Sequence, residues 1–262
     1  HEDTANRRAY ALRAGWMEQG GAPYLASLRM NQAKSWAEFV EACTFNRMPS
    51  ENMVWVDRTG TIGWQAAGIT PLRAWSGLLP VPGDGRYEWA GYRNGDELPW
   101  EFNPARGYIV TANENNVPPA HPLYKSGIGY EWADPSRAQR LHGLFKQKVA
   151  SGQRFSLPDS EQMQTDIVAV PAQRLVALLG PLQSSDARTA RALKLLTAWD
   201  GSMAADSAAA ALFNVWLMES LRQAVVATLP EAVRPVAATE FSPERLVSLL
   251  EKPGANLSAA QR

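Results

Sequence analysis

One stretch, residues 103–116, constrains this chain more than any other. Its sequence, NPARGYIVTANENN, leads from a proline-containing entry into a β-prone run at residues 108–111 and ends in Asn113, Asn115 and Asn116. Tyrosine, isoleucine, valine and threonine favour strands, so we expect residues 108–111 to form a buried strand. Such a strand would deliver side-chain amides at its end with little conformational freedom.

The asparagines at the end of this run support two interpretations. An amide N–H stabilises negative charge without titrating, so it suits a developing oxyanion in a catalytic site. Asparagine side chains also satisfy backbone groups in turns, which is their commoner use. Taken alone, the stretch favours the turn interpretation.

Composition narrows the classes of function. Lys plus Arg and Asp plus Glu number 26 each, so the chain has no formal net charge and lacks the basic excess of most nucleic-acid binders. Its one cysteine, Cys43, excludes an internal disulfide and a cysteine-based metal cluster. Helical spacing with Ala33, Trp36 and Val40 predicts that Cys43 is a small buried apolar residue. The sequence has no run of about eighteen apolar residues, so we expect no membrane span.

Motifs alone give no complete active site. The sequence has no G-x-S-x-G elbow, which leaves an α/β-hydrolase serine unsupported, and no phosphate-binding glycine loop. His1, His121 and His142 lie far apart in the sequence and form no i, i+4 pair. We therefore expect no zinc site.

The first half of the chain predicts strands, a helix and a long loop. Apolar residues three and four apart predict a helix over residues 24–45. A hairpin follows, with strands at residues 53–56 and 61–66 joined by a DRTG turn. Residues 69–107 are rich in Pro, Gly and Trp, which indicates an ordered loop because tryptophans are costly to leave in water.

The second half predicts helices. Apolar spacing of three or four marks segments 136–150, 159–180, 186–199, 203–228 and 242–251. The sequence SLPD at residues 156–159 resembles a capping box. The chain is therefore α+β, and we predict a β-rich part over residues 1–133, with the loop excursion, and a helical part over residues 134–262 packed on it.

A second stretch just upstream, residues 79–92 with sequence LPVPGDGRYEWAGY, strengthens the catalytic interpretation. Together with NPARGYIVTANENN it resembles the β-subunit of the penicillin acylase family of N-terminal nucleophile amidohydrolases. The resemblance continues in family order through ALR at residues 11–13, WAEF at 36–39, NMVWVD at 52–57, GTIG at 60–63 and DPSR at 134–137. It covers nearly the whole chain and implies part of the four-layer αββα fold, with a mostly helical C-terminal half.

The resemblance also implies a reaction. In this family the first residue of the β-subunit, exposed by autoproteolysis, attacks an acyl amide, and its own α-amino group is the general base. An N-terminal amine suits that role because its unperturbed pKa lies near neutrality. Residue 1 here is His rather than Ser, Thr or Cys, and the chain resembles an internal portion of the β-subunit. We therefore expect the nucleophile on an upstream piece and no activity from this chain alone.

Four residues are the candidates for the site that the resemblance implies. Asn115 matches the family's oxyanion asparagine in the Asn-x-Asn pattern, and Asn113 is the second choice for the same role. Arg137, in DPSR, matches an arginine that orients that site; the alternative is a first-turn arginine packed against Trp132. Glu51 aligns with a position of the acyl pocket that is apolar in penicillin G acylases, which predicts a less apolar pocket on that side.

The same resemblance implies partners and a location. The partners would be a companion α-subunit, the nucleophile-bearing N-terminal part of the β-subunit and a small-molecule N-acyl substrate. The substrate would be a β-lactam with its side chain, an N-acyl homoserine lactone or a related lipopeptide, which places the enzyme in antibiotic resistance or quorum quenching. The location would be periplasmic or extracellular. No cofactor is required, and a structural calcium ion would draw mostly on upstream acidic residues.

Two expectations complete the sequence interpretation. Asn52 is expected to be a structural hydrogen-bond partner rather than a catalytic group. The alternative to the acylase is a non-catalytic scaffold or interaction module, in which the asparagines are turn residues only.

Overall fold

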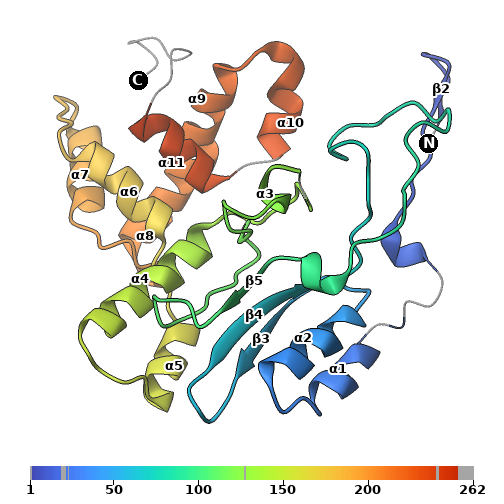
Figure 1. The fold of residues 1–262 in the computed structure, drawn as a ribbon. Helices are drawn as coiled ribbons and strands as arrows, with labels where there is room; N and C mark the ends of the chain where they lie inside the picture. Colours follow the sequence, from blue (N-terminus) through green and yellow to red (C-terminus); the bar gives the residue numbers. More distant parts are fainter. Residues whose placement is uncertain (1, 19–21, 23, 127, 240–241, 253–262) are drawn as a thin grey trace. The chain divides into compact units, whose positions relative to one another are not determined.

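The computed structural model describes residues 2–18, 22, 24–126, 128–239 and 242–252. His1, on which the expectation about the nucleophile depends, lies outside the described residues. The chain divides into two compact units (Figure 1). Unit 1 comprises His1–Thr111 and Asn115–Trp132, and unit 2 comprises Ala112–Glu114 and Ala133–Arg262.

Unit 1 is built on a three-stranded antiparallel sheet. Its elements are β1 (Glu2–Asp3), β2 (Arg8–Ala9), η1 (Gly15–Met17), α1 (Leu25–Met30), α2 (Trp36–Thr44), β3 (Glu51–Val56), β4 (Ile62–Ala67), η2 (Gly95–Glu97), β5 (Trp100–Phe102) and α3 (Leu123–Ser126). β4 is the central strand, paired with β3 on one side and β5 on the other. β1 and β2 form a separate two-stranded ribbon.

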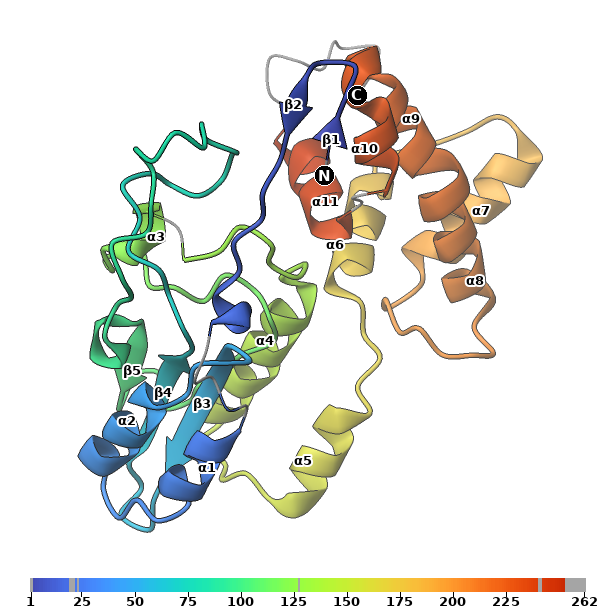
Figure 2. The same ribbon diagram turned by 90° about the vertical axis from the view of Figure 1, so that its right-hand side faces the viewer.

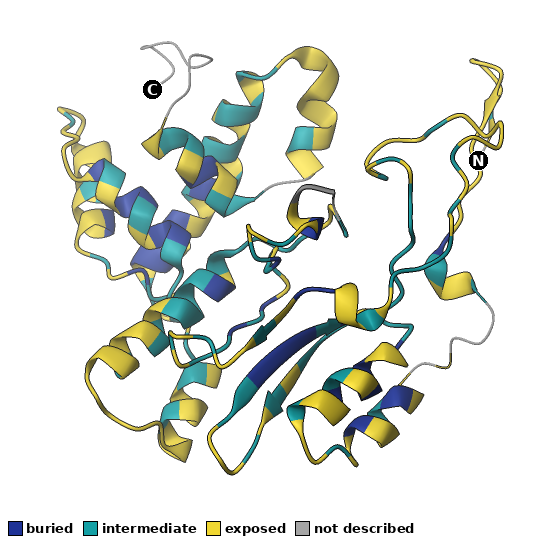
Figure 3. Ribbon diagram, viewed as in Figure 1, coloured by how far each residue is buried: buried dark blue, intermediate teal, exposed yellow. Residues whose placement is uncertain are grey.

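The helices α1 and α2 cover one face of this sheet (Figure 1). Phe39, Ala42 and Cys43 are buried on α2, and Met53 and Trp55 of β3 pack against them. Side chains alternate between the two faces of a strand, so the opposite face carries the residues between these. β4 runs as a largely buried strip through the middle of the sheet (Figure 3). The apolar pattern of α2 and β3 thus fixes which sheet face is the core of unit 1.

Cys43 has the environment that the sequence predicts. Its side chain is only 3% exposed, and burial raises the pKa of its thiol to about 12. A thiol that stays protonated at neutral pH is a poor nucleophile and a poor metal ligand. The prediction of a buried, apolar cysteine is confirmed.

The predicted hairpin is confirmed, and its turn shows why it forms. β3 and β4 pair in register from Glu51 opposite Ala67 to Val56 opposite Ile62. The Asp57 carboxylate accepts hydrogen bonds from the backbone N–H groups two and four residues ahead, at 2.8 and 3.1 Å. Gly60 closes the turn at φ +87°, a conformation that favours glycine.

Two predictions for the first half were wrong. The helix expected over residues 24–45 is broken into α1 and α2, because Ser35 caps a new helix by accepting a hydrogen bond from the N–H of Glu38. The strand expected at residues 108–111 is not assigned to the sheet. β4 is paired on both edges, by β3 and by β5, and residues 108–111 do not pair with the outer edge of either of these strands.

The loop at residues 69–107 is ordered by aromatic contacts, but it also contains η2 and β5. Trp75 packs edge-on against Tyr87, with ring centroids 5.7 Å apart, and both side chains are half-buried. Trp100, at the outer strand of the sheet, is 49% exposed, so the expectation that the loop tryptophans are buried holds only in part.

Unit 2 is helical. Its elements are α4 (Ser136–Ala150), α5 (Leu157–Gln164), α6 (Val170–Leu179), α7 (Ala187–Thr197), α8 (Ala208–Val215), the π-helical turn η3 (Trp216–Leu221), α9 (Arg222–Ala227), η4 (Glu231–Val233), α10 (Arg234–Thr239) and α11 (Pro243–Glu251). α6 and α11 lie side by side (Figure 2). Leu175, Phe213 and Val247 stand in one buried cluster, which joins α6, α8 and α11.

The helical segments were predicted correctly in type, but two of them were predicted too long. The segment 159–180 is two helices, because Pro171 stands in the first turn of α6 and cannot continue a helix from α5. The segment 203–228 begins only at Ser207, which caps α8 by accepting from the N–H of Ala210, and it changes to π-helix at Trp216. The capping box is confirmed: Ser156 and Asp159 each accept the other's backbone N–H.

No helix in the described part of the chain is long and apolar enough to cross a membrane.

Candidate active site

Asn113 and Arg137 are brought together in unit 2. Arg137 is the second residue of α4, and its Nη2 donates to the side-chain Oδ1 of Asn113 at 2.8 Å and to the carbonyl oxygen of Ala112 at 2.7 Å. The N–H of Ala133 donates to the carbonyl oxygen of Asn113 at 2.9 Å. Two hydrogen bonds from residues 133–137 therefore hold the backbone and the side chain of Asn113, and a third holds the carbonyl group of Ala112.

The contact with Arg137 determines which way the Asn113 amide faces. A guanidinium nitrogen can only donate, so the side-chain atom that faces Arg137 must be the oxygen. The amide nitrogen, Nδ2, then points elsewhere, and it has no acceptor among the described residues. A charged donor on the oxygen also polarises the amide and strengthens its N–H as a donor. Asn113 thus has an exposed, uncharged amide N–H donor, and the guanidinium of Arg137 holds its side chain in place.

The backbone of Asn113 is in the left-handed region, at φ +68°. Asparagine adopts this conformation more readily than most residues because its short polar side chain bonds locally. The same turn is fastened by Glu114, whose carboxylate accepts from the N–H of Ala112 at 2.7 Å. The turn that the asparagine-rich sequence suggests is therefore present, and it leaves the Asn113 side chain exposed.

Asn115 and Asn116 belong to unit 1 and have different contacts. The Asn115 Oδ1 accepts from the N–H of Val117 at 3.2 Å, which is an Asx-turn. Asn116 donates from Nδ2 to the Oδ1 of Asn52 at 3.0 Å, and the indole N–H of Trp64 donates to the same oxygen at 2.7 Å. Asn52 thus ties the hairpin to the asparagine segment, and its predicted structural role is confirmed.

Glu51 is the first residue of β3 and is half-buried. Strand alternation assigns its side chain to the face that carries Met53 and Trp55, which α1 and α2 cover. Asn52 lies on the opposite face, where it meets Trp64 and Asn116.

Asp134 and Ala133 support the Asn113–Arg137 contact, and the sequence interpretation did not single them out. Asp134 precedes α4, and its Oδ1 accepts from the N–H of Ser136 at 3.0 Å. Burial alone would raise the pKa of the Asp134 carboxyl, but hydrogen bonds from Ser136 and Ser242 outweigh it, and the pKa is lowered. The signal was available in the sequence, since an aspartate side chain often accepts from the backbone N–H two residues ahead in an Asx-turn.

A cavity of about 480 Å³ adjoins Arg137 in unit 2. Its wall is mostly apolar, with Leu141, Met163 and Phe213 among the lining residues. Cavities of this size and character are typical of small-molecule sites.

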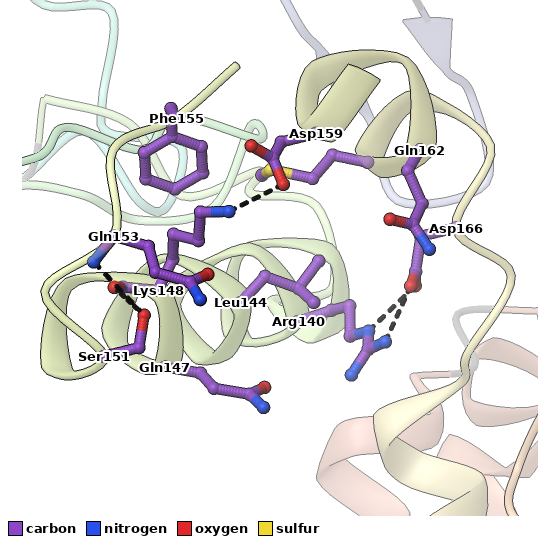
Figure 4. A pocket seen from close by; sticks show the side chains of 11 residues that line it. Arg140, Leu144, Gln147, Lys148, Ser151, Gln153, Phe155, Asp159, Gln162 and Asp166 are labelled. Atoms are coloured by element: carbon purple, nitrogen blue, oxygen red, sulfur yellow. Dashed lines mark hydrogen bonds and ion pairs between the residues drawn. The ribbon is translucent and has the colours of Figure 1, made fainter. Parts of the chain in front are cut away.

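A second cavity in unit 2, of about 400 Å³, lies between α4 and α5 and is more polar (Figure 4). Two ion pairs cross it: Lys148 to Asp159, with Nζ and Oδ1 2.7 Å apart, and Arg140 to Asp166, with Nη2 and Oδ2 2.6 Å apart (Figure 4). α5 contributes no buried residue. Asp159 lies on α5 and Asp166 lies two residues after its end, so the two ion pairs connect α4 to α5 and to the segment that follows it.

Acidification is expected to release α5 from α4. Hydrogen bonds from Lys148 and Ser156 lower the pKa of Asp159 to about 2. Because the pKa is depressed in the folded protein, the stabilisation is complete above the unfolded value of about 3.9 and is lost as the pH falls toward 2. Hydrogen-exchange protection factors of α5 amides should therefore fall between pH 5 and pH 2, measured against those of α6. In Asp159→Asn this pH dependence should weaken, because only the contribution of Asp166 remains. Equal protection of wild-type α5 at pH 5 and at pH 2 would contradict the assignment.

No group of three or more His, Cys, Asp or Glu side chains that could hold a metal ion occurs in the ranges that the structure describes.

Comparison with known proteins decides the family. The model of the family "Penicillin amidase" matches residues 2–261. The chain belongs to the penicillin amidase family.

Curated and solved relatives agree with this assignment. The chain is 31% identical over 216 residues to the acyl-homoserine lactone acylase QuiP of Pseudomonas syringae pv. syringae (strain B728a), which covers 74% of this chain and 25% of that protein. It is 30% identical over 244 residues to penicillin G acylase of Escherichia coli, which covers 87% of this chain and 28% of that protein. The chain thus spans about a quarter of the length of these relatives.

A solved structure confirms the fold class. The thermostable penicillin G acylase from Alcaligenes faecalis matches 98% of this chain and 51% of its own chain, with a TM-score of 0.74 and 25% sequence identity. The α+β class and the N-terminal nucleophile hydrolase fold that the sequence predicts are therefore confirmed.

Proposed function

We propose that this penicillin amidase family chain is part of an acylase that hydrolyses the amide bond of an N-acylated amine through an acyl-enzyme intermediate. Membership of the family supports the reaction class. The observation that carries the assignment of a site is the 2.8 Å hydrogen bond from Arg137 Nη2 to Asn113 Oδ1, which leaves the amide nitrogen of Asn113 as a donor.

In this proposal Asn113 holds the oxyanion. When the nucleophile attacks the acyl carbonyl carbon, negative charge develops on the carbonyl oxygen, and a preorganised N–H directed at it lowers the barrier. One such donor contributes roughly 3 kcal/mol in comparable hydrolases. Arg137 binds the amide oxygen of Asn113 and so keeps the N–H in place without touching the substrate. The amine then leaves, and water releases the acyl group.

The contacts favour Asn113 over Asn115, which the sequence pattern placed first. The side-chain oxygen of Asn115 accepts from the backbone N–H of Val117, which also leaves the amide nitrogen of Asn115 as a donor. Asn113 alone of the two contacts Arg137, the residue expected to orient the site. Asn115 is therefore kept as the alternative donor, and substitution of each residue separates the two assignments.

The complete enzyme requires parts beyond this chain. On this proposal a nucleophile-bearing N-terminal part of the β-subunit and an α-subunit complete the site after autoproteolytic processing, in a periplasmic or extracellular compartment. A calcium ion, if bound, would be structural. Candidate substrates are N-acyl homoserine lactones and acylated β-lactams, the classes named for two relatives. Glu51 is proposed to line the acyl pocket, because it aligns with a position of that pocket in penicillin G acylases.

The purified 262-residue chain is expected to show no amide hydrolysis, whereas the full-length protein that contains it hydrolyses N-acyl homoserine lactone or phenylacetyl amide. Release of the free amine, measured for both proteins on both substrates, checks this. An inactive full-length protein that is processed and folded would favour a non-catalytic scaffold. Activity of the isolated chain would contradict the proposal that the nucleophile lies elsewhere.

A further inference from the structure

The two cavities of unit 2 adjoin each other along α4. Four lining residues are common to both cavities: Arg140, Leu144, Met163 and Asp166. One cavity is mostly apolar, and the other is more polar, with Lys148 among its lining residues (Figure 4). A molecule bound in the apolar cavity would therefore meet charged side chains where the two cavities join.

The apolar cavity of about 480 Å³ has a wall that the core of unit 2 holds in place. Phe213 of α8 and Leu217 of η3 line it, and both side chains are buried in the core cluster. Met163, near the end of α5, also lines the cavity and is half-buried. Methionine is unbranched and adapts to irregular shapes. A fixed wall together with an adaptable side chain suits an apolar tail.

A π-helical turn forms part of this wall. α8 changes to η3 at Trp216, and Leu217 is the second residue of the turn. The flanking residues Val215 and Arg222 have ordinary right-handed helical backbone angles, so the turn is not a frayed helix end. π-helical turns are rare and occur frequently at functional sites. The turn is thus an indication of a ligand site that does not depend on the volume of the cavity.

The guanidinium of Arg140 is paired on one edge and open on the other. Its Nε and Nη2 donate to the two carboxylate oxygens of Asp166, at 2.8 and 2.6 Å. Its Nη1 has no acceptor among the described residues, and it points away from Asp166 (Figure 4). A guanidinium carries N–H donors on more than one edge, so the edge formed by Nη1 and Nη2 can bind a second carboxylate.

The charges around the apolar cavity favour an anion. Among the described residues, two arginines, Arg137 and Arg140, line it against one aspartate, Asp166. Arg137 already donates to oxygens of residues 112 and 113, so Arg140 is the cation that a ligand can reach. A cation beside an apolar cavity attracts a carboxylate head group and repels an ammonium group.

We propose that this cavity binds a carboxylate with an apolar tail. The tail lies against Leu141, Phe213 and Leu217, and the Nη1 and Nη2 edge of Arg140 binds the carboxylate. An acylase releases such a molecule, because hydrolysis of an N-acyl amine gives an acyl carboxylate and a free amine. The source of the ligand therefore rests on the proposed function, whereas the site rests on the geometry of unit 2 alone.

The Arg140–Asp166 ion pair gives the test two changes of opposite sign. Arg140→Gln removes the charged donors, so decanoate should bind about tenfold more weakly, the effect of losing a hydrogen bond to a charged group. Asp166→Asn keeps Arg140 and removes the neighbouring anion, so decanoate should bind about two- to fivefold more tightly. An ion pair that only holds the fold together would weaken binding in both variants.

The binding experiment is a calorimetric titration of the full-length protein that contains this chain with decanoate. Leu141→Trp should fill the cavity and remove one bound decanoate per protein. Leu195→Trp is the matched control, because Leu195 is 41% exposed on α7 and lines neither cavity. It should leave the number of bound decanoates unchanged. Decanol, which lacks the charge, should bind about tenfold more weakly than decanoate, and acetate, which lacks the tail, should not compete.

The outcomes separate the site from the proposed function. The same number of bound decanoates in Leu141→Trp and Leu195→Trp, equal affinity for decanol and decanoate, or weaker binding in both ion-pair variants would overturn the site. If Leu141→Trp does not fold, Leu141→Phe replaces it as the smaller filling side chain. A full-length protein that binds decanoate in the expected pattern but hydrolyses no N-acyl amine would keep the site and overturn the proposed function. Hydrolysis without any loss of binding in the filled variant would do the reverse.

Discussion

Replacing Asn113 with aspartate is expected to lower the kcat of the full-length acylase by about 10²- to 10³-fold. Aspartate has the same shape and also tolerates the left-handed backbone at φ +68°. Its carboxylate can still accept the hydrogen bond from Arg137. The NH2 group, however, is replaced by an oxygen that repels the developing oxyanion. The fold is kept while the donor is lost, so the loss should appear in kcat at nearly unchanged thermal stability.

Asn115→Asp is the control for this prediction. The side-chain oxygen of Asn115 accepts from the N–H of Val117, and an aspartate oxygen accepts the same bond. We therefore expect a change in kcat of less than about threefold, the size of an exposed polar substitution. If Asn115→Asp carried the large loss and Asn113→Asp did not, the oxyanion role would pass to Asn115.

Gly63→Ala is expected to destabilise the chain by about 1–3 kcal/mol, the usual cost of overpacking a closed site. A Cβ at Gly63 would lie 2.3 Å from the ring of Trp36. The ring cannot move aside easily, because it packs against Phe39 and Phe102, with ring centroids 5.9 and 5.3 Å away. Denaturant unfolding followed by tryptophan fluorescence measures the effect.

Gly143→Ala should have the opposite effect. Gly143 is exposed in the middle of α4, and nothing lies within 4 Å of the position of an added Cβ. Alanine is the better helix former by roughly 0.8–1 kcal/mol, so this substitution should stabilise the chain. If both substitutions changed the free energy of unfolding by the same sign and amount, glycine entropy rather than the Trp36 contact would account for Gly63.

The sequence predicts the elements that local chemistry determines. The DRTG turn defines the hairpin because an Asp carboxylate and a glycine at positive φ are enough to close it. The spacing of apolar residues locates α4, α7 and α11, and the capping box locates the start of α5. The penicillin acylase resemblance rests on motifs that follow one another along nearly the whole chain, and the family match confirms it.

The sequence does not determine which segments that lie far apart in the chain contact one another. Residues 108–111 have strand-forming side chains, but β5 pairs with β4 and this run does not. Strand propensity does not determine which of two segments pairs with a given strand. The choice between Asn113 and Asn115 depends in the same way on Arg137, 24 residues further along the chain. The hydrogen bonds that Asp134 accepts from Ser242 and Glu244 also come from distant residues, at the start of α11, which no local pattern indicates.

The most direct test of the account is a crystal structure of the full-length acylase with a boronic acid bound to its nucleophile, so that a boronate oxygen stands in for the oxyanion. We expect Nδ2 of Asn113 to lie about 2.7–3.1 Å from that oxygen, the range for an oxyanion donor, with Arg137 still on its Oδ1. A boronate oxygen that is bound by Asn115, or by neither asparagine, would contradict the assignment of Asn113 as the oxyanion donor.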